Sequence, residues 1–247
     1  MAKLRSSNIE PSTATTLALG ASSDSILISS DSLKANTWQD LGGNSLFVSD
    51  GSGSMSNINS GLKGGGYTLI STHSTIATSV SSIAITSGID STYDEYAFVI
   101  TDFHPSNDGV ALQIEFSTNG GSSYGISKMT TSWKAHQVEA GGSTLAYSPD
   151  WDRENSTSPA YVTTAEVGNQ NTESASGIFS LFTPSNTTYV KHWFSTTQHM
   201  HPAPASINPY NAGYFNTTSA IDEIQFKFNS GNIDAGKIKL YGLKDSA

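Results

Sequence analysis

The chain has 247 residues and a net charge of −9, and only 13% of its residues are charged, about half of the roughly 25% found in ordinary soluble domains. The acidic balance and the absence of any run of Lys or Arg exclude a nucleic-acid-binding protein, since nothing could follow a phosphate backbone. Cysteine is absent from the sequence, which excludes disulfide and thiol chemistry. Ser, Thr, Asn and Gly replace the missing charges, and this favours an extracellular or virion protein over a helical cytosolic enzyme.

The first residues, Met1-Ala2-Lys3-Leu4-Arg5, are not followed by the apolar stretch of a signal peptide. No apolar run approaches the roughly 20 residues that cross a membrane as a helix. We therefore expect neither an export signal nor membrane insertion. A surface-type composition without an export signal is typical of a virion protein, which is made in the host cytoplasm and released by lysis.

Residues 1–62 differ from the rest of the chain. Short apolar stretches, such as 9–20 and 26–28, alternate with Gly, Ser, Asp and Asn. Each stretch is too short to build a core within one chain. The spacing favours an extended fibrous segment wound among identical chains, with a disordered Ser/Gly linker as the alternative. We expect this segment to attach the protein to a particle and to assemble it as a homotrimer, or to clamp it onto a neighbouring virion protein.

Lys63-Gly64-Gly65-Gly66 predicts a boundary, after which the strands lengthen. The pattern predicts a second domain over 67–247 with almost no helix. Alternating Leu112, Ile114 and Phe116 require one buried face per strand. The fold class is therefore all-β, a jelly-roll-like antiparallel β-sandwich preceded by an extended fibrous N-terminal segment. The strands are expected at 67–76, 80–86, 93–101, 110–117, 126–139, 173–183, 188–196, 221–229 and 235–243.

The apolar runs 96–100 and 110–116 enclose Pro105 and the sequence Asn107-Asp108-Gly109, which are turn-forming residues. We interpret the two runs as a β-hairpin and as the central pair of the sandwich. Trp133 and Trp193 fall inside strand patterns, so both are expected in the core.

Two long loops, 147–171 and 198–214, interrupt the strand pattern. Long loops on a rigid scaffold are common binding surfaces. An exposed Trp151 could stack on the apolar face of a sugar while polar neighbours bind its hydroxyls, and the alternative is a loop anchored by a buried Trp151. The candidate ligand-binding residues are Trp151, Asp150, Asp152, Arg153, Tyr161, His199, His201 and Tyr210. A host-surface glycan is the expected ligand, and packing between subunits is the competing role of these loops.

Catalytic and metal sites are not expected. The pair His199 and His201 has no acidic third ligand beside it, so surface histidines are favoured over a zinc site. Asp150 and Asp152 lack the spacing of a calcium-binding loop and suit turns better. The sequence has no Gly-x-Ser-x-Gly elbow between a strand and a helix. We therefore expect a protein without metal, cofactor or enzymatic activity.

Several segments carry a resemblance to a known class of proteins. GIDSTYDEY (88–96), NDGVALQ (107–113), STNGGSSY (117–124) and GKIKLYGL (236–243) resemble the C-terminal β-domain of tail-fibre and other virion structural proteins of marine bacteriophages. IEPSTATTLALGAS (9–22) resembles the segments that lead into the shafts of such fibres. The resemblance implies a virion appendage, often homotrimeric, with the globular domain outermost and facing the host. The alternatives are a capsid decoration protein without receptor binding and a secreted carbohydrate-binding module.

Overall fold

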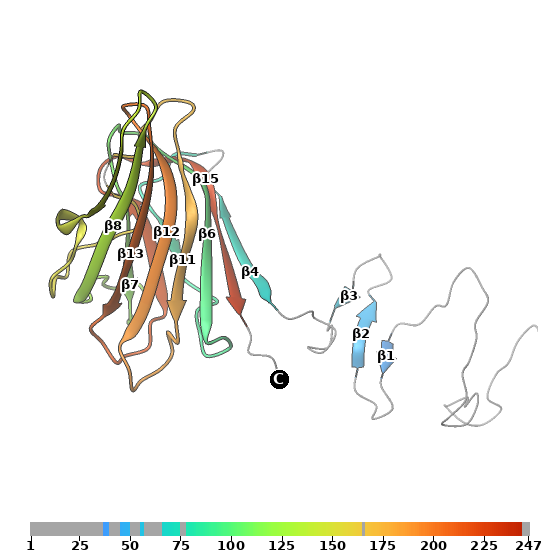
Figure 1. Ribbon diagram of the computed structural model, residues 1–247. Helices are drawn as coiled ribbons and strands as arrows, with labels where there is room; N and C mark the ends of the chain where they lie inside the picture. Colours follow the sequence, from blue (N-terminus) through green and yellow to red (C-terminus); the bar gives the residue numbers. More distant parts are fainter. Residues whose placement is uncertain are drawn as a thin grey trace, which may run out of the picture. The chain divides into compact units, whose positions relative to one another are not determined.

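The computed structural model describes residues 37–39, 45–49, 55–56, 66–74, 78–164 and 166–243 (Figure 1). The chain divides into two units, Met1–Gly64 and Gly65–Ala247, which we describe separately. The strands predicted at 9–20 and 26–28 lie outside the described residues. The predicted all-β class is confirmed, because the second unit is an antiparallel β-sandwich.

The described part of the first unit is a small antiparallel sheet. It contains β1 (Thr37–Gln39), β2 (Ser45–Ser49) and β3 (Met55–Ser56), in that order across the sheet. Trp38 of β1 and Phe47 of β2 are partners in the register, and their ring centroids lie 5.8 Å apart. This stacked pair is the main aromatic contact described in the unit.

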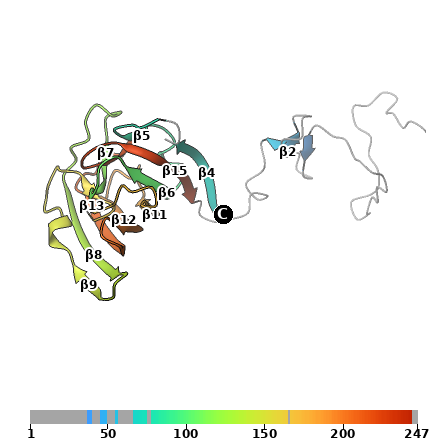
Figure 2. The ribbon, with the colours of Figure 1, turned by 90° about the horizontal axis from the view of Figure 1, so that it is seen from above.

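The second unit consists of a large and a small sheet, all of whose neighbouring strands are antiparallel (Figures 1 and 2). The large sheet has eight strands in the order β4 (Tyr67–Ser74), β15 (Ile233–Leu243), β6 (Glu95–Pro105), β11 (Ala175–Phe182), β12 (Lys191–His201), β13 (Ala205–Phe215), β8 (Lys128–Val138) and β9 (Ser143–Tyr147). The small sheet has four, in the order β10 (Ala160–Tyr161), β7 (Leu112–Ser117), β14 (Glu223–Phe228) and β5 (Ile83–Ile85). Every strand predicted after residue 66 is present, and β9, β10 and β13 were not predicted.

The core lies between the two sheets, where the view from above places β5 and β7 in a separate layer from β11, β12 and β13 (Figure 2). Phe179 of β11 is at its centre and is fully buried. Its ring lies 5.6 Å from Phe98 and 5.4 Å from Trp193 on the large sheet, and 5.9 Å from Phe116 and 6.4 Å from Phe226 on the small sheet. Aromatic rings from both sheets therefore hold the sandwich together.

The predicted hairpin is wrong. β6 belongs to the large sheet and β7 to the small sheet, so residues 106–111 carry the chain across the core instead of pairing the two strands. β6 and β7 each bury one face in the same core, from opposite sides. Two strands of a hairpin would also each bury one face, so the apolar pattern is the same in both cases. Gly109 within this crossing has a left-handed backbone (φ 65°), which glycine adopts without strain.

The predicted loop 198–214 is also wrong. It contains the end of β12, a tight turn and most of β13. The prolines hid the strand, because proline lacks the N–H that a central strand uses. The β12–β13 register is interrupted between the pairs Thr196–Tyr210 and His199–Ile207, where Pro209 lies. The side-chain amide of Asn208 donates to the carbonyl of Thr197 at that interruption.

Residues 148–164 and 166–171 cover the inner face of β8, β12 and β13. They include a 3-10 helix, Pro149–Trp151, the strand β10, and the buried Val162 and Val167. The carbonyl of Val162 accepts hydrogen bonds from Thr197 Oγ1 at 3.1 Å and from Asn211 Nδ2 at 3.0 Å. These hydrogen bonds hold the segment against the face of the large sheet opposite to the exposed Trp133 and Tyr210.

Candidate functional site: the outer face of the large sheet

Strand alternation separates the side chains of β8, β12 and β13 into two sets. The inward set is buried against the small sheet and residues 148–171, and it includes Trp193 and Phe215. The outward set includes several exposed aromatic rings. Trp133 of β8 is 42% exposed, Phe194 of β12 is 44% exposed and Tyr210 of β13 is 38% exposed. Large exposed apolar patches on soluble proteins commonly mark interaction sites, so this face is the candidate site.

A groove crosses this face. Its floor contains Ala212 and Thr131, two small side chains that are partners in the β13–β8 register. Two adjoining hollows, of about 550 and 250 Å³, share Ala212, Thr131 and Phe194 in their linings, so they form one groove. We refer to this depression as the groove. Its lining residues are Met129, Thr130, Thr131, Trp133, Phe182, His192, Trp193, Phe194, Ser195, Tyr210, Asn211, Ala212, Gly213 and Tyr214.

Aromatic side chains stand on both sides of the groove. Trp133 and Tyr210 form one wall, with ring centroids 4.1 Å apart and ring planes within 9° of parallel. The opposite side carries Tyr214 and His192, whose rings lie 6.2 Å apart. Tyr210 and Tyr214 are four residues apart on one strand, so their backbones are separated by about 14 Å at a rise of ~3.4 Å per residue.

The groove carries no acidic, Lys or Arg side chain among its lining residues. In the part of the chain that the structure describes, no side-chain hydrogen bond uses the hydroxyls of Tyr210 and Tyr214 or the imidazole of His192. These groups are available to a ligand. The arrangement offers ring faces and uncharged polar groups.

Four of the predicted site residues, Trp151, Asp152, Arg153 and Tyr161, lie close together beside β8 and β9. The Trp151 ring meets the Tyr161 ring edge to face at 4.9 Å, and the Arg153 guanidinium lies 4.3 Å from the Tyr161 ring centroid. Arg153 also donates from Nε to the Pro159 carbonyl at 2.7 Å. Asp152 accepts a hydrogen bond from Tyr147, while Asp150 is exposed.

The other predicted residues lie on β12 and β13. His199 faces inward, is fully buried, and neither ring nitrogen has a hydrogen-bond partner within the described residues. Burial lowers its pKa to about 3, and the nearby charges of Lys134 and His201 act in the same direction. Tyr210 is the member of the predicted set that lines the groove. The ligand-binding role of the set stays a prediction.

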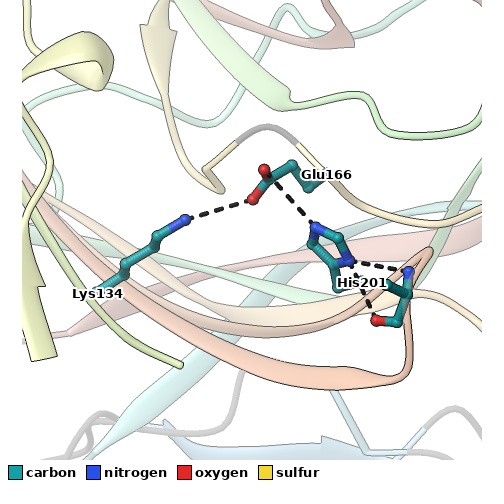
Figure 3. A network of polar contacts seen from close by, with 4 residues as sticks. Lys134, Glu166 and His201 are labelled. Carbon is teal, nitrogen blue, oxygen red and sulfur yellow. Dashed lines mark hydrogen bonds and ion pairs between the residues drawn. The ribbon is translucent and has the colours of Figure 1, made fainter. Parts of the chain in front are cut away.

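His201 belongs to a polar network at the end of β12 (Figure 3). Glu166 lies 3.3 Å from Lys134 Nζ and 3.6 Å from His201 Nε2, so it joins the covering segment to β8 and β12. His201 Nδ1 is 2.9 Å from the backbone nitrogen of Ala203, which donates to it. No group of three or more His, Asp or Glu among the described residues could hold a metal ion. The network is therefore a structural link between the segment and the sheet.

The groove residues were missed because the inward face of β8 is polar. Trp193 is buried as predicted, whereas Trp133, expected in the core, points outward. On β8 the inward positions are occupied by Lys128 and Ser132, both buried. Lys128 Nζ donates to the carbonyls of Thr157 at 3.2 Å and Ser158 at 2.7 Å. Apolar alternation alone therefore assigns the wrong face of this strand to the core.

A scan against protein-family models gave no match, and searches of curated proteins and of solved structures gave none either. In the described ranges, no helix has the length and apolar character needed to cross a membrane.

Proposed function

We propose that the chain is a structural protein of a bacteriophage particle, a tail fibre or similar appendage, whose β-sandwich attaches the particle to the host surface through the groove. One observation carries this proposal. Both inner faces of the sandwich are covered, but the outer face of β8, β12 and β13 exposes Trp133, Phe194 and Tyr210 around a hollow. Exposing these rings to water is unfavourable, which suggests that a partner covers them during function.

The proposed role is binding without catalysis. The groove presents rings and uncharged polar groups. The Glu166 network links parts of the fold, since its partners Lys134 and His201 come from strands of the large sheet. A rigid β-scaffold with an open aromatic face suits recognition better than acid–base chemistry.

Residues 1–62 are proposed to join the sandwich to the particle and to assemble a homotrimer. The sequence supports this role, because residues 1–62 alternate short apolar stretches with Gly and Ser and resemble the segments leading into fibre shafts. The low share of charged residues supports a place in the virion.

Immunogold electron microscopy tests the proposal. Antibodies raised against the purified chain are applied to phage particles concentrated from sea water. Gold at the outer ends of tail appendages is the expected result. Gold spread evenly over the capsid would instead identify a decoration protein. Recovery of the protein from bacterial culture medium, with no labelled particles, would contradict a virion role and favour a secreted carbohydrate-binding module.

A further inference from the structure

We infer that the groove binds an uncharged glycan, with a pyranose ring stacked on the wall formed by Trp133 and Tyr210. This inference rests on the proposed function in taking the groove as the contact surface, and it adds the chemical class of the ligand. The two rings cover each other's inner faces, and Trp133 remains 42% exposed and Tyr210 38% exposed.

The shape of the groove suits a thin chain of sugar rings. The two hollows have volumes of about 550 and 250 Å³, and the larger one is within the size range of small-ligand sites. They share Phe194, Ala212 and Thr131, so a ligand can extend from one to the other. The backbones of Tyr210 and Tyr214, one on each side of the groove, are about 14 Å apart along β13, and the side chains make the groove narrower than this distance. A linear oligosaccharide can enter this width, whereas a broad, flat protein surface would leave the floor uncovered.

The lining combines the two kinds of contact that a sugar needs. The apolar face of a pyranose packs on an aromatic ring, and its hydroxyls require hydrogen-bonding groups around the rim. Trp133, Tyr210 and Phe194 supply ring surface. The hydroxyl of Tyr214 and the imidazole of His192 supply polar atoms on the other side.

The charge of the groove selects against an ionic ligand. Its lining residues include no Lys or Arg to pair with a carboxylate, sulfate or phosphate, and no Asp or Glu to pair with an amine. A charged ligand would lose hydration without gaining a partner. An uncharged glycan avoids this cost, and its binding should change little with salt concentration.

The stacking contact restricts the two rings of the wall. Trp133 and Tyr210 are stacked on each other, at 4.1 Å between centroids and 9° between planes. Ordered rings lose less conformational entropy when a ligand arrives, which favours measurable affinity from a small contact.

Isothermal titration calorimetry of the full chain against a panel of oligosaccharides tests the inference. The panel contains uncharged glucose-, mannose-, galactose- and N-acetylglucosamine-based chains, and acidic chains of galacturonate and sialic acid. We expect at least one uncharged chain to bind, with its Kd changing less than about twofold between low and high salt, and the acidic chains to bind more weakly.

Three variants locate the binding. Trp133→Ala should weaken binding at least about tenfold, and Tyr210→Phe, which keeps the stacked ring, should weaken it by a smaller factor. Tyr67→Ala is the matched control, because Tyr67 is an exposed ring (56%) on β4, the opposite edge of the same sheet. It should leave binding unchanged. Thermal unfolding of each variant checks that the sandwich is intact.

Three results would overturn the inference. They are binding of none of the uncharged chains at millimolar concentration, equal loss of binding in Trp133→Ala and Tyr67→Ala, and a change of oligomeric state in Trp133→Ala, which would make this face a contact between copies of the chain. Loss of cell binding by Trp133→Ala without any oligosaccharide binding overturns the glycan ligand and leaves the proposed function standing. Oligosaccharide binding by a chain that is found on no virus particle supports the inference and refutes the proposed function.

Discussion

Replacement of Phe179 by Ala provides the strongest test of the sandwich core. Phe179 is fully buried and contacts two rings on each sheet, at centroid distances between 5.4 and 6.4 Å. Loss of a buried Phe side chain leaves a cavity and costs about 3–5 kcal/mol. With a urea m-value of about 2 kcal/mol/M, we expect the unfolding midpoint to fall by about 2 M. Urea unfolding of the full chain, followed by tryptophan fluorescence at fixed protein concentration, measures this shift.

Phe194→Ala is the matched control for this experiment. Phe194 lies on the neighbouring strand β12 but points outward into the groove. Its removal should cost less than about 1 kcal/mol, because little buried volume is lost. Phe179→Leu should fall between the two. Equal destabilisation by Phe179→Ala and Phe194→Ala would refute the assignment of inward and outward faces, and with it the exposed groove.

Four further predictions address charge, assembly and the loop cluster. Burial lowers the pKa of Lys128 from 10.5 to about 8 in the folded chain. Between these two pH values the unfolded chain binds one proton more than the folded chain, so the free energy of unfolding should rise with pH, by up to about 3 kcal/mol. Urea unfolding at several pH values measures this rise, and Lys128→Met should remove it. Because the pKa of His199 is about 3 in the folded chain and near 6.5 when unfolded, stability should fall as pH drops through that interval, and His199→Leu should show a weaker fall in acid unfolding. Deletion of residues 1–62 should leave a folded monomer in analytical ultracentrifugation, whereas retention of the full chain's oligomeric state would assign assembly to the sandwich. Trp151→Ala should cost about 1–2 kcal/mol through the lost contact with Tyr161 and leave cell binding unchanged; lost binding at unchanged stability would favour the loop site.

The sequence was sufficient to predict the fold class and most of the strands. Apolar alternation, as in Leu112, Ile114 and Phe116, identifies a strand with one buried face. It does not identify the partner strand. Residues 96–116 have the same pattern in a hairpin and in a crossing between sheets. The strand pairing distinguishes them, because β6 pairs with β11 and β15 whereas β7 pairs with β10 and β14.

The groove could not be predicted from apolar patterns, because it depends on tertiary features that oppose them. β8 buries Lys128 and exposes Trp133, and this reversal is possible only because the carbonyls of residues 157 and 158 accept the Lys128 hydrogen bonds. β13 contains Pro209, which argues against a central strand until the compensating Asn208 hydrogen bond is known. The predicted set included Tyr210 for its place in a supposed loop, and the strand places it in the groove instead.

Binding of the labelled full chain to bacterial cells tests the central claim most directly, namely that the outer face of the large sheet contacts the host. Fluorescent wild type, Trp133→Ala and Tyr67→Ala are incubated with a collection of marine bacteria, and bound protein is measured per cell. The account predicts that wild type and Tyr67→Ala label the same subset of strains, and that Trp133→Ala labels these strains at least about tenfold less. Equal labelling by wild type and a folded Trp133→Ala would contradict it.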